Sequence, residues 1–174
     1  GIVDAGINSI FDSFLLILCY GPLLVGYGYV INFMSDAEID RRSSVTKDLV
    51  MAKQPFAAGT LSKRQGATLA LILAASGLFL SWHVNPSVLA VGCGLLILAT
   101  AYSYPPRLKE VPLLDVLTNG AIVTLCYIAG WVAFQPISAI SPYPVIWIFF
   151  LVSATYLLTV LIDVSSDRES GVRS

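Results

Sequence analysis

Five long apolar stretches, separated by short polar connections, dominate the pattern of hydrophobic and polar positions along this chain. They cover residues 13–34, 66–84, 86–104, 112–134 and 144–162. About 20 apolar residues are needed for a helix to cross the hydrocarbon core of a bilayer, so each stretch predicts one membrane-spanning helix. The connections near 84–86 and 135–143 carry prolines and polar residues that interrupt helices. We therefore predict an all-α, polytopic transmembrane bundle, with residues 1–174 forming one membrane domain.

Composition narrows the class of protein further. Hydrophobic residues make up 56% of the 174 residues and charged residues only 12%, about half of the ~25% typical of soluble domains. These values exclude a disordered chain, a nucleic-acid binder with a basic face and most soluble enzymes. The three cysteines lie in apolar runs without any C-x-x-C spacing, which excludes a zinc site of that type. The expected partner is the lipid bilayer, with no nucleic acid.

The basic residues predict the orientation of the spans. All ten lie in alternate connections or at the end of the chain, whereas the connections at 84–86 and 135–143 carry none. Basic connections face the cytoplasm in membrane proteins, so we predict a multi-pass protein of the cell membrane with its N-terminus outside. The chain starts without an initiator Met or a signal peptide. We expect it to be a piece of a longer protein. The basic residues are Arg41, Arg42, Lys47, Lys53, Lys63, Arg64, Arg107, Lys109, Arg168 and Arg173.

Carboxylates recur at four-residue spacing where two spans reach the cytoplasmic side. The first span ends in Asn32-x3-Asp36-x3-Asp40 and the last in Asp163-x3-Asp167. Such spacing puts the side chains on one helical face, where like charges repel. Each motif alone is typical of a solvated helix end, but two of them at the same membrane face favour a paired site. Because Mg²⁺ prefers carboxylate, water and phosphate oxygens, we predict that these four catalytic aspartates hold Mg²⁺ around a diphosphate.

A basic turn after the third span could serve the same diphosphate. Residues 102–109 read Tyr-Ser-Tyr-Pro-Pro-Arg-Leu-Lys, so two hydroxyl residues, Tyr102 and Ser103, lie close to Arg107 and Lys109. A departing diphosphate needs cations and hydrogen-bond donors, which makes a functional role the better interpretation of this turn. Lys53 stands before a Gln-Pro pair in the first cytoplasmic loop. For the basic pair at 63–64, a simple topological role is favoured.

Together these motifs make the chain similar to the UbiA-type intramembrane prenyltransferases. The resemblance rests on four segments in the family's order: 32–40, 53–62 with Lys-Gln-Pro-x3-Gly and Leu-Ser, 102–109, and 163–168. The family fold implied is a helical bundle of usually nine spans around a cavity open to lipid. By this resemblance the five spans correspond to the second to sixth, so the first and the last three would be missing.

The resemblance also implies an activity: Mg²⁺-dependent transfer of a prenyl group from an allylic isoprenyl diphosphate to a lipophilic acceptor. The residues that would ligate Mg²⁺ are Asn32, Asp36, Asp40, Asp163 and Asp167. Tyr102, Ser103 and Lys109 would contact the diphosphate, with Arg107 beside them. The family often has Arg where this chain has Gln54, so that phosphate contact is either lost or moved to Lys53. Asp115 and Asn119 either line the cavity and contact the acceptor or form hydrogen bonds to a neighbouring helix, and the sequence leaves both open.

The long loop from Asp40 to Pro55, together with segments 102–109, 112–115 and 119–120, looks most like the carotenoid branch of the family. That likeness implies lycopene elongation in the synthesis of C50 carotenoids. The alternative acceptors are a quinone precursor, a chlorophyllide or a glycerolipid. Two non-enzymatic alternatives are a transporter fragment, which predicts acids near mid-membrane, and a structural subunit, which leaves the acid spacing unexplained.

Overall fold

The protein is described by a computed structural model that covers the backbone of residues 2–42 and 54–169, and the side chains of residues 10–41 and 54–161. The described chain is helical, with no strand in these ranges. Its helices are α1 (Ile2–Leu18), the π-helical segment η1 (Cys19–Val25), α2 (Gly26–Arg42), α4 (Lys63–Val84), α5 (Pro86–Ser103), the 3-10 turn η2 (Leu108–Glu110), α6 (Pro112–Phe134), the 3-10 turn η3 (Ile137–Ala139) and α7 (Pro142–Glu169).

Five helical stretches are long and apolar enough to cross a membrane. They are Ile10–Arg41, Lys63–Val84, Pro86–Ser103, Pro112–Phe134 and Pro142–Leu161. The first runs through α1, η1 and α2 as one continuous rod, although Pro22 lies inside η1. The predicted all-α fold with five spans is therefore confirmed.

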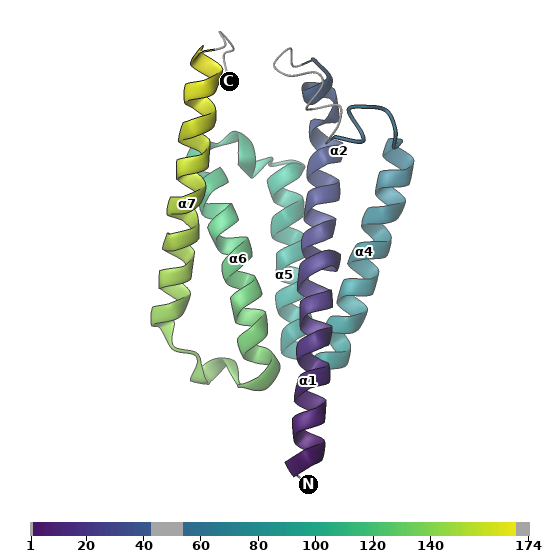
Figure 1. Ribbon diagram of the computed structural model, residues 1–174, viewed down its shortest axis with the longest axis vertical. Helices are drawn as coiled ribbons and strands as arrows, with labels where there is room; N and C mark the ends of the chain where they lie inside the picture. Colours follow the sequence, from purple (N-terminus) through teal and green to yellow (C-terminus); the bar gives the residue numbers. More distant parts are fainter. Residues whose placement is uncertain (1, 43–53, 170–174) are drawn as a thin grey trace.

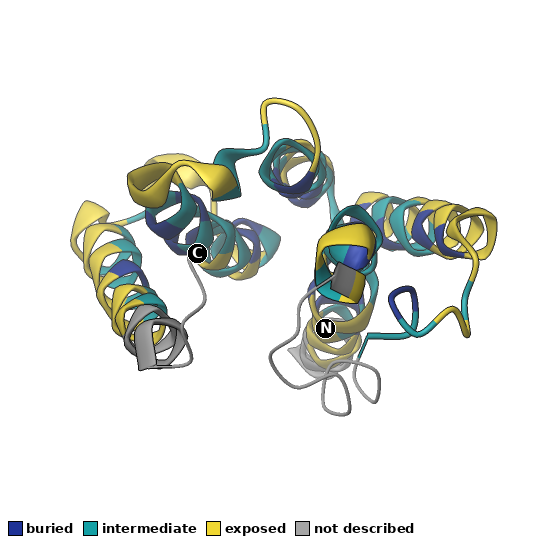
Figure 2. Ribbon diagram, turned by 90° about the horizontal axis from the view of Figure 1, so that it is seen from above, coloured by how far each residue is buried: buried dark blue, intermediate teal, exposed yellow. Residues whose placement is uncertain are grey.

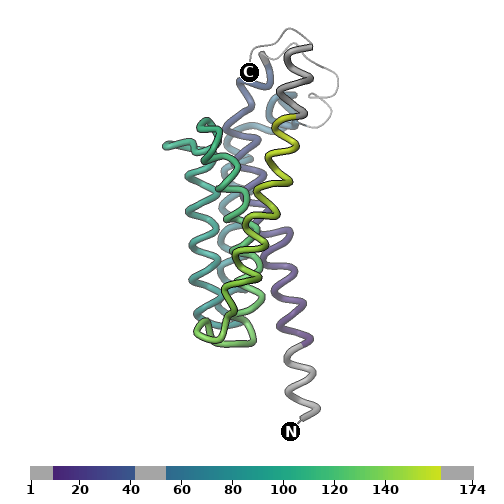
Figure 3. Tube along the Cα trace, turned by 90° about the vertical axis from the view of Figure 1, so that its left-hand side faces the viewer, coloured from purple at the N-terminus to yellow at the C-terminus, as the bar shows by residue number. Residues whose placement is uncertain are grey.

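The helices stand side by side with their long axes roughly aligned (Figures 1 and 3). Seen from above, α7, α6, α5 and α2 follow one another around an open arc (Figure 2). Helix α4 packs against α2, η1 and α5, while α7 packs on α6. Four parts of the chain lie at the same end of the bundle: the end of α2, the start of α4, the connection between α5 and α6, and the end of α7. We call this the loop-rich end; it carries the connections predicted to be cytoplasmic.

Local sequence signals explain where the helices begin. Ser62 caps α4 reciprocally with Gln65: its hydroxyl accepts from the Gln65 amide, and its own amide donates to the Gln65 side chain. Asn85 caps α5 by accepting from the amide of Val88 at 2.9 Å, and its Nδ2 donates to the carbonyl of Val132 in α6. Pro112 opens α6 at a position that requires no amide hydrogen. These caps fix the hairpin of α4 and α5 against α6.

The half of the bundle away from the loop-rich end is filled by a hydrophobic core. Its buried residues come from α1, η1, α5 and α6, and they include Tyr20, Leu24, Val88, Leu95 and Ala129. Small residues let the helices approach here: a Cβ on Gly77 would collide with the Leu24 side chain. The tight packing of this half leaves the other half, nearer the loop-rich end, as the part of the bundle that can hold a ligand.

Candidate active site

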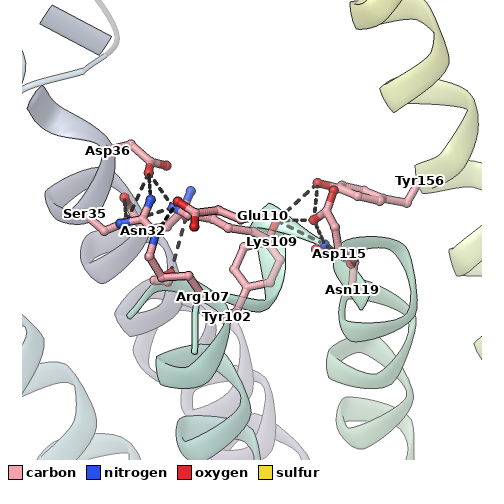
Figure 4. A network of polar contacts seen from close by, with 11 residues as sticks. Asn32, Ser35, Asp36, Tyr102, Arg107, Lys109, Glu110, Asp115, Asn119 and Tyr156 are labelled. Atoms are coloured by element: carbon pink, nitrogen blue, oxygen red, sulfur yellow. Dashed lines mark hydrogen bonds and ion pairs between the residues drawn. The ribbon is translucent and has the colours of Figure 1, made fainter. Parts of the chain in front are cut away.

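Side chains of α2 and η2 meet at the loop-rich end around one ammonium group. Lys109 Nζ donates to Asn32 Oδ1 and to Ser35 Oγ, each at 2.8 Å, and forms an ion pair with Asp36 (Figure 4). Ser35 Oγ in turn donates to the Asn32 carbonyl and to Asp36 Oδ1. The spacing of Asn32, Ser35 and Asp36 along α2 puts all three on the side facing η2. This group stays largely out of solvent, since the Lys109 side chain is only 12% exposed.

A second cation and a hydroxyl complete this arrangement. Arg107 forms ion pairs with Asp36 (Nη2–Oδ1 3.6 Å) and with the exposed Glu110 (Nε–Oε1 2.6 Å). Its backbone is left-handed, with φ at 56°. Ser103, the last residue of α5, donates from Oγ to Asn32 Oδ1 at 3.4 Å. We call the set Asn32, Ser35, Asp36, Ser103, Arg107 and Lys109 the α2–η2 cluster.

A separate polar group lies where α5, α6 and α7 meet, and we call it the tyrosine–aspartate cluster: Tyr102, Asp115, Asn119 and Tyr156 (Figure 4). Asp115 Oδ1 accepts from Tyr102 Oη at 2.8 Å, from Tyr156 Oη at 3.2 Å and from Asn119 Nδ2 at 3.3 Å. The two tyrosine hydroxyls are themselves 3.2 Å apart. Consecutive residues of α5 thus face different clusters, because Ser103 points to α2 and Tyr102 to α6 and α7.

An apolar cavity of about 330 Å³ lies beside both clusters. Side chains with polar groups in its lining are Tyr29, Asn32, Tyr102, Asn119 and Tyr156, and the remaining wall is apolar. The volume falls at the lower end of the range for small-molecule sites. At its far end Leu24, Leu95 and Cys126 close the cavity against the hydrophobic core. The cavity therefore has an apolar floor and a polar end, where its lining residue Asn32 accepts from the ammonium group of Lys109.

The oxygen atoms of the α2–η2 cluster are of the kind that bind a hard divalent cation. Asn32 Oδ1, Ser35 Oγ and Asp36 Oδ1 already converge on one cation, the Lys109 ammonium. One turn farther along α2, Asp40 Oδ2 is buried without a hydrogen-bond partner among the described residues. These donors fit Mg²⁺. Within the described side chains no group of three or more His, Cys, Asp or Glu gathers.

Most of the predicted site residues whose side chains the structure describes lie in one of the two clusters. Asn32, Asp36, Ser103, Arg107 and Lys109 form one cluster, and Tyr102 and Asn119 belong to the other. Asp40 follows Asp36 one turn along α2, and among the described side chains no hydrogen bond or ion pair joins it to the cluster. Lys53 lies outside the described residues. The backbone of Asp163 and Asp167 is helical in α7, but their side chains lie outside the described set.

Two residues of the clusters, Ser35 and Tyr156, were not predicted from the sequence. Ser35 stands beside Asp36 without belonging to the four-residue spacing, and Tyr156 lies in an apolar run. A signal for Tyr156 existed, because it precedes Asp163 by seven residues and so shares a helical face with it. Tyr29 precedes Asp36 by the same interval, and it also lines the cavity.

Residues 3–174 match the sequence model of the UbiA prenyltransferase family. A lycopene elongase/hydratase of Halobacterium salinarum is 29% identical over 158 residues, covering 85% of this chain and 51% of that protein. A digeranylgeranylglyceryl phosphate synthase of Sulfolobus acidocaldarius is 24% identical, covering 92% of this chain and 55% of that protein.

A UbiA homologue from Archaeoglobus fulgidus, solved with GPP and Mg²⁺ bound, superimposes with a TM-score of 0.76 at 25% sequence identity. The match covers 92% of this chain and 55% of that one. The same homologue bound to DMAPP and Mg²⁺ gives the same values. The chain thus spans about half of the length of these proteins.

Proposed function

This chain belongs to the UbiA prenyltransferase family, and from that premise we propose that the protein transfers a prenyl group from an allylic isoprenyl diphosphate to a lipophilic acceptor within the membrane. One observation carries the proposal: a polar cluster with two cations, Lys109 and Arg107, shares Asn32 with the lining of a mainly apolar cavity. An isoprenyl diphosphate has the same two halves. Its charged head matches Lys109 and Arg107, and its hydrocarbon tail matches the cavity wall.

In this proposal Asn32, Asp36 and Asp40, with Asp163 and Asp167 from α7, hold Mg²⁺. When bound, Mg²⁺ neutralises the diphosphate and stabilises it as a leaving group. Lys109 and Arg107 supply further positive charge, and Ser103 supplies a hydroxyl donor. Lys53 and Tyr102 are proposed as additional contacts to the donor, and Asn119 as a contact from the cavity wall. The apolar lining keeps water away from the allylic cation that forms when the diphosphate departs.

The depth of the cavity favours a short donor. From Tyr102 to Leu95 on α5, and from Asn119 to Cys126 on α6, the chain advances seven residues, which is about 10 Å at the helical rise. An extended chain gains about 1.2 Å per bond, so one four-bond isoprene unit occupies about 5 Å. Two such units reach the floor at Leu95, which is 1% exposed. We therefore propose a donor with one or two isoprene units.

For the acceptor we propose lycopene, elongated towards C50 carotenoids. The segments 102–109 and 112–120 support this choice, and a lycopene elongase/hydratase is among the similar proteins. The other acceptors to be weighed against it are a quinone precursor, a chlorophyllide and a glycerolipid. We place the site at the cytoplasmic face of the cell membrane, because Arg41, Lys63, Arg107 and Lys109 all belong to the loop-rich end.

The test uses the full-length protein in bacterial membranes that contain lycopene. Pigments are extracted from cells with the wild-type protein and with Asp36→Asn, and mass spectrometry measures the addition of C5 units. C45 or C50 carotenoids that are absent from the variant would support both the acceptor and the site. Wild-type membranes that form no new carotenoid but prenylate another lipid would overturn the choice of lycopene alone.

A further inference from the structure

Asp115 and Tyr156, two members of the tyrosine–aspartate cluster, have no role in binding Mg²⁺ or the diphosphate as proposed above. Asp115 carries a carboxylate that forms no ion pair within the described residues, and its partners Tyr102, Tyr156 and Asn119 are neutral hydrogen-bond donors. Those three partners line the apolar cavity. Ionisable groups beside hydrocarbon are costly to keep and mark functional sites.

We propose that this cluster takes up the proton that the acceptor loses during prenyl transfer, an inference that rests on the proposed function. Asp115 acts as the final proton acceptor, and the hydroxyls of Tyr102 and Tyr156 connect it to the cavity. Proton transfer by a positioned carboxylate is a common means of catalysis. Asp115 is a positioning residue here because it works through the two tyrosines.

The step balances without any further reactant. The C–O bond of the donor breaks, and its electron pair leaves with the diphosphate. An electron pair of the acceptor then forms the new bond to the allylic carbon, after which the acceptor must lose one proton. That proton goes to Oη of Tyr102 or Tyr156 as the hydroxyl passes its own proton along the hydrogen bond to Asp115 Oδ1. The products are the prenylated acceptor, diphosphate and a protonated Asp115 that later returns its proton to water.

The other described acids near the cavity are less suited to this task. Asp36 is engaged by Lys109 and Arg107, and it is also assigned to metal binding. Glu110 pairs with Arg107 and its side chain is 59% exposed, so it faces solvent. Asp115 is within 3.3 Å of three groups that line the cavity. Its placement therefore connects the cavity to a base through the hydroxyl groups of Tyr102 and Tyr156.

Three variants of the full-length protein test the inference. Asp115→Asn keeps the size of the side chain but removes its basicity, Asp115→Ala opens space for an added formate ion, and Asp12→Asn is a control on α1, at the opposite end of the first span. Two quantities are measured for each variant. One is the binding of an unreactive thiolo analogue of geranyl diphosphate with Mg²⁺, and the other is the amount of prenylated product in a single turnover.

We expect Asp115→Asn to bind the analogue within twofold of the wild type while transfer slows about 100-fold or more, a typical effect of losing an acid–base group. Added formate should raise the rate of transfer by Asp115→Ala at least tenfold. A purely structural role of Asp115 does not predict this rescue. Transfer within threefold of the wild type, or a parallel loss of analogue binding, would overturn the inference. If Asp115→Asn does not fold, the double variant Tyr102→Phe/Tyr156→Phe decides, because either hydroxyl can pass the proton to Asp115. Its single-turnover transfer is measured at saturating donor: slower transfer supports the inference, and unchanged transfer overturns it. If the wild-type protein itself showed no prenyl transfer, the result would overturn the proposed function rather than the role of Asp115.

Discussion

Replacing Lys109 by Met separates the contribution of one ammonium group from that of the metal site. Lys109 Nζ contacts Asn32 and Ser35 at 2.8 Å and pairs with Asp36. Methionine has nearly the same length as lysine and no charge, so the substitution removes the ammonium group with little change in side-chain volume. The variant loses the cation proposed to bind the diphosphate, and it leaves Asp36 with Arg107 at 3.6 Å as its described ion-pair partner.

The size of the effect follows from the type of contact. A hydrogen bond to a charged group contributes about 1.5–3 kcal/mol, which corresponds to roughly 10- to 150-fold in affinity. Donor affinity should therefore fall by that factor. The affinity for Mg²⁺ should not fall, because Asp36 is released from an ion pair that competes with the metal.

The assay is a titration of the full-length protein with the thiolo analogue of geranyl diphosphate at several Mg²⁺ concentrations. Lys63→Met is the matched control, since Lys63 is an exposed lysine at the start of α4 and at the same end of the bundle. Equal losses in both variants would mean that only the overall charge of this end matters. An unchanged affinity in Lys109→Met would refute the assigned contact.

Three further substitutions test other parts of the account. In Gly120→Ala the new methyl group would collide with Ser153 Oγ and lie 2.9 Å from a backbone carbonyl of α7. Thermal unfolding should therefore show a loss of about 1–3 kcal/mol in stability. Gly130→Ala is the control, because open space surrounds that position, and it should show no loss. Val123→Phe fills the cavity from an exposed position on α6, and geranyl transfer should fall at least tenfold relative to dimethylallyl transfer. Asp36→Asn should lower turnover by at least 100-fold with normal expression, as measured by product formation; near-normal turnover would contradict the metal site.

The fold could be predicted from the sequence because membrane spans depend on local composition. Runs of about 20 apolar residues gave the five spans, and the Pro and Asn signals near 85–86 and 112 coincide with helix starts. The continuation of α2 through Asp36 and Asp40 to Arg42 was outside the predicted span. Hydropathy shows only where the apolar residues end. The helix itself continues beyond that point, because its polar residues lie at the loop-rich end, outside the apolar part of the span.

The site was predictable in part for the same reason. The four-residue spacing on α2 identified Asn32 and Asp36, and the diproline turn identified Lys109, which the structure brings to them. The sequence left open whether Asn119 lines the cavity or contacts a neighbouring helix. In the structure it lines the cavity and also donates a hydrogen bond to Tyr102 of α5. Tyr156 could not be assigned, because its contact with Asp115 depends on how α6 and α7 pack.

The central claim is prenyl transfer at the polar end of the cavity, and one measurement tests it most directly. Membranes containing the full-length protein are given radiolabelled dimethylallyl diphosphate and a lipid extract that supplies acceptors, with Mg²⁺ or with EDTA, and the label in the organic phase is counted. We predict that the label enters a lipid product with Mg²⁺, and that EDTA or Asp36→Asn abolishes this transfer. Label that stays in the diphosphate under every condition, or a lipid product that forms equally in EDTA, would contradict the account.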